Sequence, residues 1–192
     1  MGVLLIDFLL EEGEKWVNAL TAMLGVIFSG ISLYMLLYIS PVGEEAFGRS
    51  IRIDPFFIFF SFVFLASAAL VILLSARYLE IEKEHHAEYY ALMLFATIGM
   101  MFLACGNDLI VLFIGLETMA ISFYILTGFL RNDRRSNEGA LKYLLLGAFS
   151  SGILAYGFSL LYGISGSTNL DDIRTAVASR PHSDILVILA LA

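Results

Sequence analysis

Charged residues are scarce in this sequence, and their scarcity excludes a soluble fold. Charged side chains make up 15% of the 192 residues, against roughly 25% in ordinary soluble domains. Hydrophobic residues make up 59%, so a protein in water would have too few polar side chains to cover its core. The same apolar residues suffice for several bilayer spans. We therefore expect an integral membrane protein.

Cysteine, clustered basic residues and cofactor motifs are also lacking. Cys105 is the only cysteine, so the chain can form neither an internal disulfide nor a cysteine-based metal site. The 11 lysines and arginines are scattered and the net charge is −7, which argues against a nucleic-acid partner. The adjacent His85 and His86 lack a third ligand, and there is no glycine-rich phosphate motif. We expect no flavin, iron–sulfur cluster, nucleotide or metal in this chain.

Five apolar segments are long enough to cross a bilayer, which takes about 20 mostly apolar residues. They do not alternate between apolar and polar residues as barrel strands do. Lipid offers the backbone no hydrogen bonds, so we expect helices. Asp54-Pro55 and the turn Gly106-Asn107-Asp108 are typical of helix boundaries. The predicted spans are about 16–40, 55–79, 87–105, 109–130 and 138–163.

Shorter apolar segments lie at both ends of the chain. Residues 184–192 begin another span, but they are too few to cross about 30 Å of hydrocarbon at 1.5 Å per residue. Residues 3–10 are typical of the tail of a preceding helix. We therefore expect residues 1–192 to form a single, truncated transmembrane domain: an all-α bundle of five complete helices with partial ones at each end.

Basic residues in short loops predict the orientation of the bundle. Loop 131–138 contains Arg131, Arg134 and Arg135, which places it in the cytoplasm, although the overall bias of lysine and arginine is small. Segment 164–183 then lies outside. Within it, residues 170–177 are predicted to form a short amphipathic surface helix.

Glu117 lies about halfway along the predicted span 109–130, which has no other charged residue. An ionised side chain at that depth costs about 2.5–3.5 kcal/mol on insertion scales, so it is rare without a use or a partner. We favour a proton-relay or ion-site residue. The alternative is a protonated carboxyl group that is hydrogen-bonded to another helix and has no role in transport.

Lys142 lies one turn inside the predicted span 138–163. Glu138 precedes it by four residues, the favourable order for an ion pair on a helix surface, and lysines near helix ends commonly extend to the interface. Position alone therefore leaves transport and interfacial pairing equally open. Because Glu117 and Lys142 differ in depth by roughly 15 Å at 1.5 Å per residue, we expect no direct ion pair between them.

Small residues recur at every fourth position of the same span. They allow helix backbones to approach closely, and we interpret them as packing rather than catalysis. They are Gly147, Ser151, Ala155, Ser159 and Gly163.

These residues resemble a known family. Segment 107–170 is similar to the N subunit of proton-translocating NADH:quinone oxidoreductase, respiratory complex I, and to the wider family of antiporter-like membrane subunits. The similarity rests on the GLE motif (115–117), the basic loop ending in RRSNE (134–138) and ALKYLLLGAFSSG (140–152) directly after it. It extends more weakly back to Asp54.

The resemblance implies part of a larger antiporter-like fold that pumps protons through buried glutamates and lysines linked by water. Glu117 corresponds to the carboxylate of the family's fifth helix and Lys142 to the lysine near the start of its sixth, both as proton-relay residues. The family's central lysines would lie beyond residue 192, so this segment should not pump alone.

The same resemblance implies a role within a complex. The chain would be a subunit of an NADH:quinone oxidoreductase, a translocase of the bacterial inner membrane, with the other membrane subunits and the bilayer as its partners. The whole complex, and not this chain, would use NADH and quinone.

Two other interpretations remain open. A subunit of a multisubunit cation/proton antiporter or of a membrane-bound hydrogenase would have the same helices and the same glutamate, and would differ in its partners. A membrane scaffold that anchors a soluble enzyme would account for the small residues and the basic loop, but it would have no need of a charge at mid-span.

Overall fold

The computed structural model describes residues 2–7, 16–39, 43–82, 87–181 and 185–191. Five of its helices are long and apolar enough to cross a membrane, which confirms the predicted fold class. They are α2 (Trp16–Ile39), α3 (Pro55–Glu82), α4 (Ala87–Cys105), α5 (Leu109–Thr127) and α6 (Arg134–Ser165). The shorter elements are α1 (Gly2–Asp7), strands β1 (Glu44–Ala46) and β2 (Ile51–Ile53), α7 (Leu170–Ala178) and α8 (Ile185–Leu191).

The ends of α5 and α6 differ from the predicted bounds because local capping fixes them. α5 ends at Thr127, before the predicted residue 130, where the backbone N–H of Gly128 bonds to the Tyr124 and Ile125 carbonyls. α6 begins at Arg134, before the predicted residue 138, because the Asp133 carboxylate accepts a hydrogen bond from the backbone N–H of Arg135. An N-terminal cap of this kind satisfies a helix N–H that has no partner within the helix.

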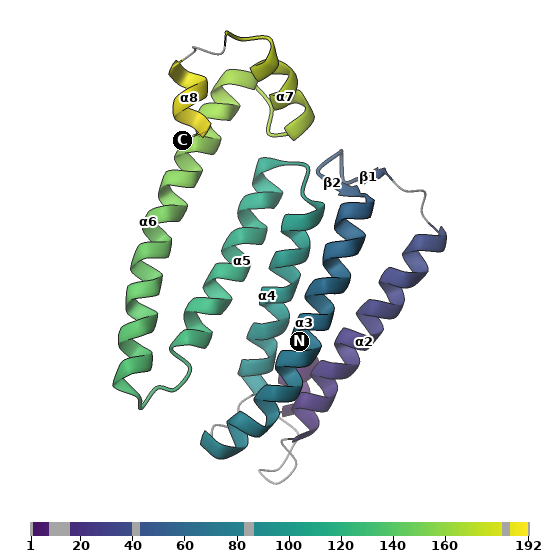
Figure 1. Ribbon diagram of the computed structural model, residues 1–192, viewed down its shortest axis with the longest axis vertical. Coiled ribbons are helices and arrows are strands. Elements are labelled where there is room, and N and C mark those ends of the chain that lie inside the picture. Colours follow the sequence, from purple (N-terminus) through teal and green to yellow (C-terminus); the bar gives the residue numbers. More distant parts are fainter. Residues whose placement is uncertain (1, 8–15, 40–42, 83–86, 182–184, 192) are drawn as a thin grey trace.

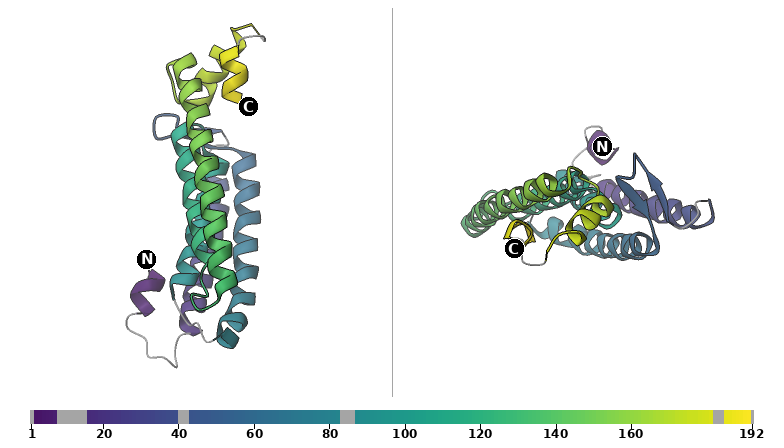
Figure 2. Two further views of the ribbon diagram at one scale, coloured as in Figure 1. Left: turned by 90° about the vertical axis from the view of Figure 1, so that its left-hand side faces the viewer. Right: turned by 90° about the horizontal axis from the view of Figure 1, so that it is seen from above.

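The long helices stand side by side, and helices that follow one another in sequence are antiparallel neighbours (Figure 1). The basic loop between α5 and α6 lies at one end of the molecule, and α7, α8 and the β1–β2 hairpin lie at the other. Seen from above, the helices form an elongated layer with α6 at one edge (Figure 2). Most of the side chains of α6 are exposed, and Leu161 is its only buried residue. Apolar side chains that are exposed in this way suit contact with lipid or with further membrane helices.

α4 and α5 form the tightest pair of helices because two glycines face each other. A Cβ atom on Gly99 would lie 2.6 Å from the Gly115 carbonyl oxygen, and one on Gly115 would lie 3.0 Å from the Gly99 carbonyl oxygen. Small residues at a helix crossing let the backbones approach closely, and the resulting van der Waals packing contributes to helix association in lipid.

Three segments that are distant in sequence meet at the end of the bundle opposite the basic loop. The hairpin joins the α4–α5 turn where the Asn107 N–H donates to the Ser50 carbonyl over 2.9 Å. Two backbone hydrogen bonds join the α4–α5 turn to the α6–α7 turn. The Leu109 N–H donates to the Thr168 carbonyl (2.9 Å), and the Leu170 N–H donates to the Asn107 carbonyl (3.0 Å). These bonds tie the start of α5 to the end of α6 and fix the two helices along their common axis. We call this end the polar junction.

α7 confirms the predicted short helix at 170–177. The Asn169 side chain caps its first turn by accepting from the Asp171 N–H, and Ile173 is buried beneath it. The β1–β2 hairpin was not predicted. It pairs Glu44 with Ile53 in antiparallel register, in the segment between the predicted spans 16–40 and 55–79.

We predict that Gly99→Ala destabilises the folded protein by roughly 1–3 kcal/mol, because overpacking a close contact forces backbone shifts of that cost. Gly152→Ala on the open face of α6 is the matched control, since nothing lies within 4 Å of its added Cβ. Thermal unfolding of the purified protein in mild detergent measures both. Equal unfolding midpoints for the two variants would contradict the packing described for α4 and α5.

Candidate functional site

The structure places Glu117 near the middle of a membrane-spanning helix. Asp108 caps α5 by accepting a hydrogen bond from the Ile110 N–H over 2.8 Å, and Glu117 is the ninth of the 19 residues of this helix. The cap and the polar junction set where α5 begins. They therefore also set the depth of the carboxylate.

The carboxylate of Glu117 faces α6, where the Ser151 hydroxyl donates a hydrogen bond to its Oε1 atom. Both side chains are half-buried. Among the described residues Glu117 forms no ion pair, so its partner is a neutral hydroxyl. A serine hydroxyl can both donate and accept. It can therefore remain hydrogen-bonded to this side chain in either protonation state.

Ser151 is the site residue that the sequence analysis did not identify. We had interpreted it only as one of the small residues that allow packing. Gly147, one turn earlier, does serve packing, because a Cβ atom there would lie 1.8 Å from the hydroxyl oxygen of Tyr124. At Ser151 the same face of α6 supplies a polar contact to the one charged side chain of α5.

Lys142 lies apart from Glu117. Its Nζ atom is 2.6 Å from the Glu138 Oε1 atom, and both side chains are largely exposed (70% and 57%). The surface ion pair, one of the two interpretations left open by the sequence, is thus present. The structure does not bring together the two residues that the resemblance joins in one relay, and any exchange between them needs water or another group in between.

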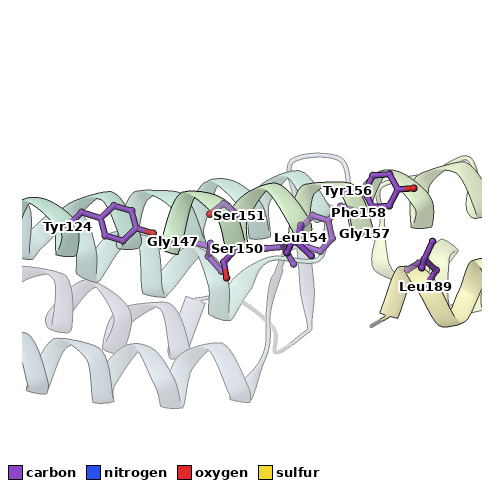
Figure 3. Close-up of a pocket in the computed structure, with 12 residues that line it drawn as sticks. Tyr124, Gly147, Ser150, Ser151, Leu154, Tyr156, Gly157, Phe158 and Leu189 are labelled. Atoms are coloured by element: carbon purple, nitrogen blue, oxygen red, sulfur yellow. The ribbon is translucent and has the colours of Figure 1, made fainter. Parts of the chain in front are cut away.

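A pocket of about 660 Å³ lies between α5, α6 and α8, next to Ser151. Its walls are mostly apolar, with hydroxyl groups from Tyr124, Ser150, Ser151 and Tyr156. Figure 3 shows Tyr124, Ser150 and Ser151 toward one end of the pocket and Leu189 of α8 toward the other. The Tyr124 ring packs edge-to-face against Tyr143 of α6, with ring centroids 4.7 Å apart. Tyr124, Ser150 and Ser151 thus lie toward the end beside the Ser151–Glu117 hydrogen bond, whereas Tyr156 lies toward the end with Leu189.

The residues available for a metal or cofactor are few. In the parts of the chain that the structure describes, no three His, Cys, Asp or Glu side chains are grouped closely enough to hold a metal ion. His85 and His86, the pair weighed in the sequence analysis, lie outside these parts.

Ion pairs reinforce the polar junction. Arg52 of β2 lies 2.5 Å from the Asp171 carboxylate and 3.0 Å from that of Glu45, and Arg49 approaches Asp171 at 3.6 Å. The Asn107 side chain also donates to Asp171 over 3.3 Å. Hydrogen bonds from Asn107 and then Arg52 hold the pKa of Asp171 below its usual value, against the opposing effect of desolvation. Hydrogen bonds to Glu45 and Asp171 raise the pKa of Arg52.

Comparison with known proteins finds matches along the whole chain. Residues 106–192 match a family described as NADH:quinone oxidoreductase/Mrp antiporter, TM. The chain is 52% identical to NADH-quinone oxidoreductase subunit N 2 of Solibacter usitatus, in a match that covers 100% of this chain and 40% of that protein. It is also 52% identical to NADH-quinone oxidoreductase subunit N 1 of Koribacter versatilis, in a match that covers 94% of this chain and 37% of that protein. The chain spans about two fifths of the length of these curated relatives.

Two solved structures share the fold. A chain of respiratory complex I from Thermus thermophilus with bound aureothin aligns with a TM-score of 0.77 and 27% identity, over 99% of this chain and 39% of that one. A chain of the membrane-bound sulfane sulfur reductase, an archaeal respiratory membrane complex, aligns with a TM-score of 0.74 over 98% of this chain and 39% of that one. At 22% identity the second likeness is one of fold alone.

We predict that acid weakens the polar junction. Because the pKa of Asp171 is lower in the folded chain than the usual 3.8, its ionised form stabilises the fold above that value. This stabilisation disappears as the pH falls through the lowered folded pKa. Thermal unfolding in detergent between about pH 5 and about pH 2 measures the effect. Asp171→Asn should remove part of the pH dependence, whereas Glu44→Gln on the exposed hairpin should not. An unchanged pH profile for Asp171→Asn would contradict the assignment.

Proposed function

Because the chain belongs to the family of antiporter-like membrane subunits, as its N-subunit relatives and the match over residues 106–192 establish, we propose that it is a proton-translocating membrane part of an NADH:quinone oxidoreductase. In this role it couples quinone reduction elsewhere in the complex to proton movement across the bilayer. In this proposal the redox centres belong to other subunits, and the complete translocase uses NADH and quinone. Its partners are the other membrane subunits of that complex.

The observation that carries this proposal is the Glu117 carboxylate at mid-span with a hydroxyl as its partner. A charge at this depth is costly and marks a functional site by default. A permanent cation beside it would favour the ionised form alone. The Ser151 hydroxyl instead accommodates both protonation states, which is what a group that takes up and releases a proton requires.

Lys142 is the second relay residue of the proposal. It lies nine residues before Ser151 on α6, which corresponds to about 14 Å along the helix in the direction of the basic loop. We propose that it exchanges protons with Glu117 through water. The ion pair with Glu138 then holds the Lys142 ammonium group at the membrane surface between proton exchanges.

The proposed location is the inner (plasma) membrane of a bacterium, as a multi-pass protein. The five candidate spans support a membrane protein, and the similar N subunits come from bacteria. The basic loop between α5 and α6 faces the cytoplasm under the positive-inside rule. The polar junction then faces the opposite side.

A second candidate function is a subunit of a cation/proton antiporter or of a membrane-bound hydrogenase. The family match supports this second function, because the description of the matched family includes Mrp antiporters. A subunit of such an assembly would have the same helices and the same glutamate and would differ in its partners. The helices of this chain fit both candidates.

We expect flavin, iron–sulfur clusters and NADH–quinone activity to co-purify with the full gene product when it is tagged and purified from native membranes in mild detergent. Absorption spectra and NADH oxidation measure these directly. Colourless membrane subunits without redox activity would instead favour the cation/proton antiporter.

We predict that Glu117→Gln lowers proton translocation about a hundredfold or more, the scale expected for a positioned proton-transfer group. Glu117→Ala should do the same. Proton uptake into vesicles that contain the assembled complex measures the effect. Thr118→Val, whose wild-type hydroxyl bonds to Ile114 O within its own helix, is the control and should pump normally. Normal pumping by both Glu117 variants in fully assembled complexes would overturn the proposal.

A further inference from the structure

Ser151 is the point where the carboxylate and the pocket meet. Its hydroxyl donates to Glu117, and the residue also lines the pocket between α5, α6 and α8. Glu117 itself does not line this pocket. A proton that moves between the pocket and the carboxylate therefore has Ser151 in its path.

The hydrogen bond of Ser151 is of a different kind from that of most hydroxyls in the spans. Serine and threonine side chains in membrane helices usually bond to a carbonyl one turn back. Ser159, two turns further along α6, does so with the Tyr156 carbonyl. Ser151 instead crosses to another helix and bonds to a titratable side chain.

The end of the pocket beside Ser151 has the groups that water needs. A buried water takes up about 30 Å³ and requires two to four polar partners, and the pocket holds about 660 Å³. The side chains of Tyr124 and Ser150 lie with Ser151 toward one end (Figure 3). The Tyr124 hydroxyl approaches α6 at Gly147, one turn from Ser151. Water that enters this part of the pocket would find the hydroxyl groups of Tyr124, Ser150 and Ser151 as hydrogen-bond partners.

We propose that Ser151 is the relay hydroxyl through which Glu117 exchanges protons with water in this pocket. The inference rests on the proposed function, because it assigns an access route to the same carboxylate. It assigns to Ser151 the transfer of the proton, beyond the close helix packing that its size allows.

The proposed step conserves atoms and charge. Ser151 gives its hydroxyl proton to the Glu117 carboxylate while a protonated water in the pocket gives a proton to the serine oxygen. One O–H bond breaks and one forms at the serine, which ends neutral. The net change is one proton moved from pocket water to Glu117, and the reverse sequence releases it.

The test compares Ser151→Ala, Ser151→Thr and Ser159→Ala in the assembled complex, reconstituted into proteoliposomes. Proton translocation per electron transferred is measured, and native gels report assembly. We expect Ser151→Ala to lower translocation at least about tenfold. Ser151→Thr keeps a hydroxyl and should retain most of the wild-type translocation per electron, and Ser159→Ala should be unaffected. Ser151→Cys is a second variant of similar size whose thiol donates weakly, and it should assemble and pump slowly.

Glu117→Gln in the same assay separates this inference from the proposed function. If Glu117→Gln abolishes pumping while Ser151→Ala or Ser151→Cys pumps normally, the serine relay is wrong and the carboxylate retains its role. Equal impairment of Ser151→Ala and Ser151→Thr would identify a packing effect and would also overturn the relay. Normal pumping by Glu117→Gln overturns both proposals. The relay predicts that adding Ser151→Ala to Glu117→Gln causes no further loss.

Discussion

Lipid forms no hydrogen bonds with a protein, and the arrangement of this chain depends on that constraint. The five long segments are α-helices, so their backbone groups bond within each helix, as those of any spanning segment in hydrocarbon must. Side-chain hydroxyls follow the same rule, mostly by bonding to a nearby carbonyl of their own helix. Glu117 is too costly to leave without a partner, and the neighbouring helix supplies one in Ser151. The candidate site is therefore a direct consequence of a charge inserted in a medium that cannot solvate it.

Two features set the alignment of that pair. The backbone bonds at Asn107, Leu109 and Thr168 tie the start of α5 to the end of α6, and the salt bridges of Arg52 and Asp171 hold the hairpin over this junction. Gly147 then lets Tyr124 approach α6 next to the serine. A shift of one helix by a single turn, about 5.4 Å, would separate the carboxylate from the hydroxyl. The surface network at one end of the bundle thus contributes to a contact near its middle.

The sequence predicted the helices and the depth of Glu117 because hydrophobic length and charge are local properties. It also contained an unused signal for Ser151. Glu117 lies 13 residues before the predicted end of its span (130 − 117), and Ser151 lies 13 residues after the predicted start of the next (151 − 138). Antiparallel neighbours therefore place both at one depth. The contacts of the β1–β2 hairpin with α7 were not predictable in this way, because they join segments more than 100 residues apart. The relay roles of Glu117 and Lys142 stay predictions.

The central claim is that Glu117 changes its protonation state while hydrogen-bonded to Ser151. Infrared difference spectroscopy of the assembled complex during turnover measures this most directly, through the carbonyl stretch of a protonated carboxyl group. The account predicts a band that appears during turnover, is absent in Glu117→Gln and shifts in Ser151→Ala because the hydrogen bond is lost. A difference spectrum that Glu117→Gln leaves unchanged would contradict the claim.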